Sequence, residues 1–429
     1  MTDNINTVRE PLIRIAKRGD IKRGKAVMLY TFSVLFAIVI GGIFISFIGV
    51  NPFRFYTEVF LGCFKSRIYF FGLIRTIMPL LITSIGISFA FKMKFWNIGA
   101  EGQFIIGAVC ATAVGLFLAD SLSHWLLITL MFVAGAVGGG VYGLITAVFK
   151  VQFGTNETLL TLMFNYIALY IVQYLTKVDG FRVEGSRPGI KVFSANAWLD
   201  QIGGIDITII FCIVIVFAAF VYFRFTKHGY EVMIVGESQN TARYAGMNVK
   251  KIVLRTMFLS AAIIGVAGMF QASGSATGHQ LTVGITGGVG WTAIIVAWLA
   301  KLNPFGILAV SVLMGILKKG SEVANSSLGV STAVSDILQS IILFSVLAFD
   351  FFINYRVIIK PNKFTKNIKI ALNKLGKNFK RCRPISADGT EIAVNNAYTD
   401  IEAKSYSVLL EDNLTVNNDN PSETQEEEK

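Results

Sequence analysis

Charged residues are scarce in this sequence. They make up 15% of the 429 residues, whereas 53% are hydrophobic, and a soluble domain of this length carries about 25% charged residues. This composition excludes an ordinary soluble domain and indicates that the lipid bilayer is the main solvent of the chain.

The residue types that hold metals or nucleotides are also sparse. Four cysteines and three histidines lie far apart, without the CxxC or Cys/His spacing that metal sites use. No GxxxxGK sequence is followed by Ser or Thr, and no Ser/His/Asp or paired-carboxylate constellation stands out. We therefore expect no metal, no cofactor, no ATP hydrolysis by this chain and no enzymatic activity.

A net charge of +12 is compatible with nucleic-acid binding, but the basic residues gather beside the apolar runs. Anionic lipid headgroups and the insertion machinery read such flanking Lys and Arg residues. We interpret the charge as a signal of membrane orientation, and we expect contact with membrane lipid and none with nucleic acid.

Long apolar runs dominate the remainder. A helix needs roughly 20 apolar residues to cross about 30 Å of hydrocarbon. The pattern predicts an all-α, polytopic transmembrane helical bundle of about ten spans, near residues 26–50, 73–91, 103–119, 125–149, 157–175, 205–223, 254–273, 284–300, 304–318 and 330–353. A polar stretch at 319–328 is expected to separate the last two. Eight spans plus a re-entrant pair is the alternative.

The two ends of the chain predict its orientation. Residues 1–25 are polar and basic, unlike a signal peptide, and residues 354–383 carry lysines and arginines without any acid. Because Lys and Arg favour the cytoplasmic side, both termini of this multi-pass protein of the cell membrane are expected there. The transmembrane domain then covers 26–353, followed by a basic amphipathic segment at 354–383 and an acidic, disordered tail at 384–429.

The two halves of the transmembrane region resemble each other weakly. The run from Ile74 to Met78 is similar to that from Leu254 to Phe258, and Gly154-Thr155 opens a helix much as Gly329-Val330 does. The first copy begins outside and the second inside, so the halves are expected to form an inverted repeat, which is common in alternating-access transporters. Chance similarity between two apolar sequences is the alternative.

A long polar interval at residues 224–255 is predominantly basic, which assigns it to the cytoplasm. It is either a plain connecting loop or a functional element. Within it, residues 237–246 can form a short surface helix that a capping residue opens and a glycine stops. A partner protein would be able to dock on such a helix.

Four runs of residues, in the same order along the chain, resemble one family of permeases. They are Phe95 to Gln103, Gly154 to Glu157 with Leu162 to Ala168, Gly236 to Met247, and Gly290 to Ile294 running into Lys301 to Pro304. These runs are similar to motifs in the permease subunits of bacterial ATP-driven (ABC) importers of ribose, branched-chain amino acids and nucleosides. The second run resembles the nucleoside branch, whereas Trp291 stands where nucleoside-type relatives have a smaller residue or phenylalanine.

The resemblance implies a function and partners. The chain is expected to be the permease subunit of an ABC importer that translocates nucleosides or a related small solute by alternating access. Its partners would be a cytoplasmic ABC ATPase subunit, a second permease subunit (a related chain or a second copy) and an extracytoplasmic solute-binding protein or lipoprotein. The alternative is a stand-alone ion-coupled secondary transporter that uses membrane carboxylates such as Glu101 or Glu157.

Two sets of site residues follow. The resemblance assigns coupling to the ATPase to Glu237, Asn240, Ala242, Arg243, Tyr244, Ala245 and Gly246. The translocation pathway or its gates are expected at Asn97, Glu101, Gln103, Asn156, Glu157, Asn165 and Trp291, chiefly because buried amides and carboxylates are costly unless they face a cavity or pair. Helix capping or packing is the alternative role for this second set.

The repeat also predicts where the gates lie. Residues 97–103 and 154–158 open helices from the cytoplasmic side and are expected to build an inner gate. Their counterparts in the second half, residues 284–292 and 329–336, are expected to line an outer gate.

Overall fold

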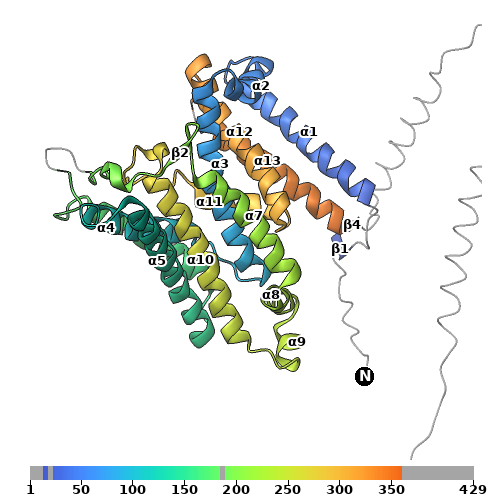
Figure 1. The fold of residues 1–429 in the computed structure, drawn as a ribbon. Coiled ribbons are helices and arrows are strands. Elements are labelled where there is room, and N and C mark those ends of the chain that lie inside the picture. The colour runs from blue at the N-terminus through green and yellow to red at the C-terminus, as the bar shows by residue number, and fades with distance from the viewer. Residues whose placement is uncertain (1–12, 18–22, 184–188, 332, 360–429) are drawn as a thin grey trace, which may run out of the picture. The chain divides into compact units, whose positions relative to one another are not determined.

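The computed structural model describes residues 13–17, 23–183, 189–331 and 333–359, which are mainly helical (Figure 1). The helices are α1 (Arg23–Phe47), α2 (Pro52–Leu61), α3 (Arg67–Lys92), α4 (Ala100–Phe117), α5 (His124–Phe153), α6 (Glu157–Leu175), α7 (Thr208–Phe225), α8 (Lys227–Glu237), α9 (Gln239–Tyr244), α10 (Val249–Ser273), α11 (Val289–Leu299), α12 (Pro304–Leu328) and α13 (Ala333–Asn354). Short 3-10 turns lie at Gly62–Phe64, Ala195–Ala197 and Ser275–Thr277.

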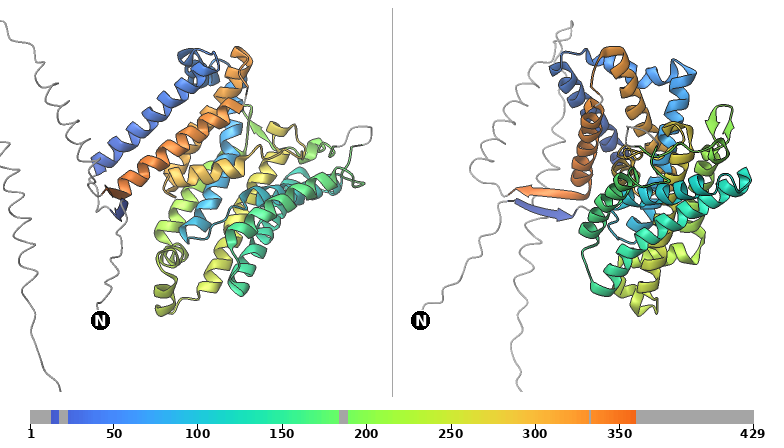
Figure 2. Two further views of the ribbon diagram at one scale, coloured as in Figure 1. Left: turned by 180° about the vertical axis from the view of Figure 1, so that it is seen from behind. Right: turned by 90° about the vertical axis from the view of Figure 1, so that its left-hand side faces the viewer.

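Two small sheets complete the described structure. Strand β1 (Ile13–Lys17) pairs with β4 (Tyr355–Ile359), as the right-hand view of Figure 2 shows. Strand β2 (Gln201–Ile202) pairs antiparallel with β3 (Ile205–Asp206) just before α7.

The helices all belong to one compact unit, Ile15–Val357. The other unit, Met1–Arg14 with Ile358–Lys429, lies almost wholly outside the described residues. The acidic tail predicted at 384–429 therefore lies outside them, and so do most of the basic segments predicted at 1–25 and 354–383.

Six helices in the described part of the chain are long and apolar enough to cross a membrane, namely α3, α4, α5, α6, α7 and α10. Helices α1 and α2 add a seventh if the bent pair Leu35–Phe47 and Pro52–Phe64, which turns by 118°, is one span. The chain is accordingly a polytopic helical membrane protein, as its apolar runs predict.

Each of the ten predicted spans coincides with a helix, but several bounds differ. Helix α11 has 11 residues and is about 16 Å long, too short to cross about 30 Å of hydrocarbon. The predicted polar break at 319–328 is wrong, because α12 continues to Leu328. Its polar residues have partners, since Lys319 pairs with Glu322 at 2.6 Å. Helix α2, which Asn51 caps, was not predicted.

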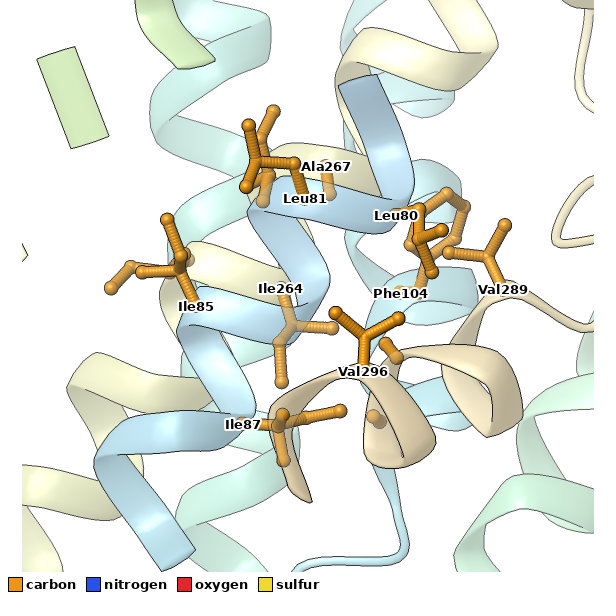
Figure 3. Close-up of a cluster of buried hydrophobic side chains, with 14 of the residues drawn as sticks. Leu80, Leu81, Ile85, Ile87, Phe104, Ile264, Ala267, Val289 and Val296 are labelled. Carbon is orange, nitrogen blue, oxygen red and sulfur yellow. The ribbon is translucent and has the colours of Figure 1, made fainter. Parts of the chain in front are cut away.

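The core lies where α3, α4, α10 and α11 meet. Figure 3 shows buried aliphatic and aromatic side chains from these four helices facing one another, among them Leu81, Phe104, Ile264 and Val296. In α10, 72% of the most apolar stretch is buried inside the protein, against 22% in α6. Outer helices expose apolar side chains instead, a surface that suits lipid contact.

Glycines allow α4, α5 and α10 to approach at backbone distance. A Cβ atom on Gly268 of α10 would collide with the carbonyl oxygen of Phe104 in α4. Gly265 of α10 likewise meets the backbone of Gly139 in α5. Because lipid tails give helices no hydrophobic drive to associate, such close packing is a main source of cohesion within a membrane bundle.

Replacing Gly268 with alanine is expected to lower the stability of this helix trio. The added methyl group has no room beside the Phe104 carbonyl, and overpacking of this kind costs about 1–3 kcal/mol. The thermal midpoint of the purified protein in detergent measures the effect. Gly284→Ala is the matched control, because a Cβ there meets nothing within 4 Å. Equal midpoints for the two variants would contradict the packing described.

Candidate functional site

The start of α4 is held by a pair of buried amides. Asn97 Nδ2 donates to Gln103 Oε1 and Gln103 Nε2 donates to Asn97 Oδ1, both at 3.0 Å. Asn97 Oδ1 also accepts the Gly99 amide at 3.1 Å. Both side chains are almost fully buried, so this reciprocal pair fixes the turn that leads from α3 into α4.

Asn165 attaches this turn to α6. Its Oδ1 accepts the Gly102 amide at 2.8 Å and its Nδ2 donates to the Ile98 carbonyl at 2.9 Å. The side chain is 5% exposed. The structure therefore brings Asn97, Gln103 and Asn165 together, and in this conformation their amides bind the protein itself.

Glu101 joins the first half of the chain to the second. Its Oε2 accepts the Gly290 amide at 2.7 Å, with Thr286 and Gly288 beside the same carboxylate. Gly290 lies in the first turn of α11, where the amides have no partner within the helix. A carboxylate from α4 thus caps α11.

This contact corrects the predicted arrangement of gates. Glu101 was assigned to an inner gate and residues 284–292 to an outer gate, yet Glu101 and Gly290 are hydrogen-bonded. The two cannot lie at opposite faces of the membrane. Instead, the amino termini of α4 and α11 lie side by side, joined by this hydrogen bond.

Helix α12 supports the same junction. Lys318 Nζ donates to the Gly287 carbonyl at 2.7 Å, in a turn where Gly287 and Gly288 have φ angles of +50° and +77°. Only glycine adopts such angles readily. The turn before α11 is therefore held between the Glu101 carboxylate and the Lys318 ammonium group.

Asn156 and Glu157 lie apart from this cluster, at the turn between α5 and α6. Asn156 caps α6, since its Oδ1 accepts the amides of Thr158 and Leu159 at 3.0 and 3.3 Å. Glu157 pairs with Lys150 at 2.6 Å. For Asn156 the capping alternative holds, and Glu157 lines a groove beside α9.

Trp291 follows Gly290 in α11 and is 43% exposed. Its indole lies one residue beyond the amide that Glu101 accepts. The residue after Gly290 is therefore a large aromatic whose side chain is partly accessible.

The short helix predicted within 237–246 is present as α9. Ser238 caps it by accepting the Thr241 amide at 3.2 Å, and Gly246, with φ of +77°, ends the segment. Ala242 is fully buried. The other predicted coupling residues, Glu237, Asn240, Arg243, Tyr244, Ala245 and Gly246, are exposed.

Sequence reasoning missed α8, the helix that carries α9. A Cβ on Gly236 would collide with the carbonyl oxygen of Lys92, so α8 packs directly against the end of α3. Glu231 of α8 accepts a hydrogen bond from Arg255 of α10 at 2.9 Å and lies 3.4 Å from His228. The available signals were the capping residue Thr226, whose hydroxyl accepts the Gly229 amide at 3.0 Å, and the i, i+3 spacing of the apolar residues Val232 and Val235.

The Glu231 carboxylate is stabilised in its charged form. Burial alone would raise its pKa, but hydrogen bonds and positive charge from Arg255 and His228 outweigh that effect and lower the pKa below the ordinary value of 4.5. Helix α8 is thereby attached to both α3 and α10, which are two of the core helices.

Fold and site together define a multi-pass helical membrane protein whose buried polar groups gather at internal helix ends. The chain belongs to the family described as branched-chain amino acid transport system / permease component, whose sequence pattern matches residues 69–347. It is the permease component of an ABC importer and is not itself the ATPase. The predicted family is confirmed, and membership decides against a stand-alone secondary transporter.

Curated relatives agree in class and differ in solute. The chain is 29% identical to the guanosine ABC transporter permease NupP of Bacillus subtilis, over 76% of this chain and 94% of that protein. It is 26% identical to the glucose ABC transporter permease TsgB13 of Haloferax volcanii, over 76% and 88%. It is 24% identical to the nucleoside ABC transporter permease NupB of Lactococcus lactis, over 75% and 91%.

Neutralising Glu231 is expected to change how stability depends on pH. Because the folded-state pKa is lowered, the contribution of this carboxylate is complete above about pH 4.5 and is lost as the pH falls through the folded value. Glu231→Gln should therefore have a lower thermal midpoint than wild type at pH 7, and the gap should close on acidification. Glu237→Gln, at the exposed end of α8, is the control. Parallel curves for wild type and Glu231→Gln would contradict the ion pair.

Proposed function

We propose that this permease imports nucleosides. Relatives named for guanosine and for nucleosides match it along most of their length, and residues 154–157 with 162–168 resemble the nucleoside branch of the family. A relative named for glucose has similar identity, so a sugar is the competing solute. A companion permease and an extracytoplasmic binding protein are further parts of the proposed importer.

We also propose ten crossings in two inverted halves, with both termini in the cytoplasm; the segment that contains the short helix α11 would be a broken span. The start of α3 and the end of α10 line one small pocket, which Arg75 and Gln271 share. Ser260 of α10 donates to the Gly86 carbonyl of α3 at 2.7 Å. These two helices, which begin the proposed repeats, therefore run antiparallel, as an inverted pair must.

The observation that carries the proposal is the contact between Glu101 and the amino terminus of α11. Transporters with inverted repeats often use broken helices whose ends meet within the membrane near the solute path. Helix α11 has the length of such a half-helix, and α4 from the other half meets it. We assign the translocation pathway to this junction, with Asn97, Gln103 and Asn165 shaping it rather than binding solute directly.

The same contact favours an uncharged solute. A free helix amino terminus attracts anions, but here a protein carboxylate already occupies it. Nucleosides and sugars carry no negative charge that would compete. Trp291 is partly exposed beside this contact, and an indole can stack against a nucleobase, which favours nucleosides over sugars.

The test is uptake of radiolabelled nucleosides into proteoliposomes that contain the permease with its ATPase, companion permease and binding protein. We expect uptake only when all partners and internal ATP are present. Unlabelled nucleosides should compete with the label, and glucose and ribose should not. Competition by sugars alone would replace the nucleoside with a sugar.

Helix α9 is the proposed contact with the ATPase, and its exposed residues provide a clean test. Tyr244 is 93% exposed, so Tyr244→Ala should leave the thermal midpoint unchanged. Loss of an exposed aromatic anchor typically costs about 2 kcal/mol of binding or more, and we expect ATP-driven uptake to fall about tenfold or more while ATP hydrolysis continues.

Tyr174→Ala is the matched control, because Tyr174 is also exposed but lies at the opposite end of α6 from the turn at Asn156. Substitutions at Ala242 and Gly246 are less informative, since one is buried and the other has a positive φ. Normal coupled uptake by Tyr244→Ala would remove α9 from the coupling mechanism.

A further inference from the structure

A basic groove lies beside α9. It has a volume of about 140 Å³, and its charged or amide-bearing side chains are Lys94, Lys150, Glu157, Gln239, Arg243 and Lys250. Pockets that enclose small solutes are larger, about 300–1,000 Å³. The groove therefore has room for one or two side chains of a partner and not for a transported solute.

The charge of the groove is largely uncompensated. Lys150 is neutralised by Glu157 at 2.6 Å. For Lys94, Arg243 and Lys250, the part of the chain that the structure describes provides no ion-pair partner. Three like charges in one small depression repel one another, and an acidic group seated among them would relieve that repulsion.

The floor of the groove is apolar. Phe95 and Val249 line it and are 5% and 8% exposed. A basic rim over an apolar floor fits a segment that combines carboxylates with an apolar side chain. We take the occupant to be a protein because the groove is partly lined by α9, the proposed contact with the ATPase.

Lys94 has an unusual backbone. Its φ angle is +57°, in the left-handed region where a residue with a Cβ costs about 1 kcal/mol or more relative to glycine. Lys94 thus places an exposed positive charge at a position where glycine would have the lower backbone conformational energy. Strained residues of this kind cluster at functional sites.

We propose that this groove receives an acidic segment of the cytoplasmic ATPase subunit, as a second docking point next to α9. The proposal rests on the proposed function, since it requires an ATPase partner. A segment bound in the groove would contact three parts of the permease. These are the turn between α3 and α4, the turn between α5 and α6, and the α9–α10 segment.

The position of the groove explains how binding of the ATPase there would move residues of the proposed translocation pathway. Phe95 lies in its floor, and two residues later Asn97 begins the amide network that holds the start of α4. A force applied at Lys94 and Phe95 would therefore pass directly to the turn before Glu101.

Lys250 and Lys251 provide a matched pair for the test. They are adjacent in the first turn of α10 and both are exposed, but only Lys250 lines the groove. We would measure binding of the fluorescently labelled cognate ATPase, held with a non-hydrolysable ATP analogue, to the permease complex in phosphatidylcholine nanodiscs. Lys250→Glu should weaken binding about tenfold at low salt and reduce its salt dependence, whereas Lys251→Glu should change it less than about twofold. Lys250→Gln should lie between wild type and Lys250→Glu.

Three outcomes would overturn the proposal. If wild type binds the ATPase and the two glutamate variants behave alike, the groove is not a docking point, and the proposed function is untouched. If Lys250→Glu matters only when phosphatidylglycerol is added to the nanodiscs, the groove binds lipid headgroups. If wild type does not bind the ATPase at all, the proposed function fails together with the groove.

Discussion

A carboxylate among apolar helices is stable only where hydrogen-bond donors meet it, and Glu101 meets them at the first turn of α11. It accepts the Gly290 amide at 2.7 Å, and the positive end of the helix dipole adds to the attraction. Without this carboxylate the Gly290 amide would lose its partner, and without α11 the carboxylate would lose this donor. The two short helix ends are therefore interdependent, and whatever positions α4 also positions α11.

Several polar contacts extend from that point toward α9, the proposed contact with the ATPase. The Asn97–Gln103 pair and Asn165 fix the turn before α4, and this turn continues directly from α3. The end of α3 packs against α8, which carries α9 and is bound to α10 through Glu231 and Arg255. Rigid elements joined by a few polar contacts can transmit a displacement over such a distance. This continuity explains why the polar residues of an otherwise apolar chain gather at helix ends.

What the sequence could predict was local. The residues that begin and end the α9 segment, the capping Ser238 and Gly246, lie within ten residues of each other and can be recognised from the sequence. The apolar runs indicate membrane helices by their length alone. The contact between Glu101 and Gly290 joins residues 189 positions apart, and no local pattern announces it. Residues 319–328 were predicted to separate two spans because the stretch is polar, whereas they form the end of α12. The partners of Lys318 and Lys319, the Gly287 carbonyl and Glu322, become visible only in the fold.

The most direct measurement of the central claim is hydrogen–deuterium exchange at the start of α11, compared between wild type and Glu101→Leu. If the Glu101 carboxylate holds the α11 terminus, its loss removes a charge-assisted hydrogen bond of about 1.5–3 kcal/mol. Amides around Gly290 should then exchange about tenfold faster or more, while those in the middle of α10 stay unchanged. Equal exchange around Gly290 in both proteins would contradict the role given to this contact.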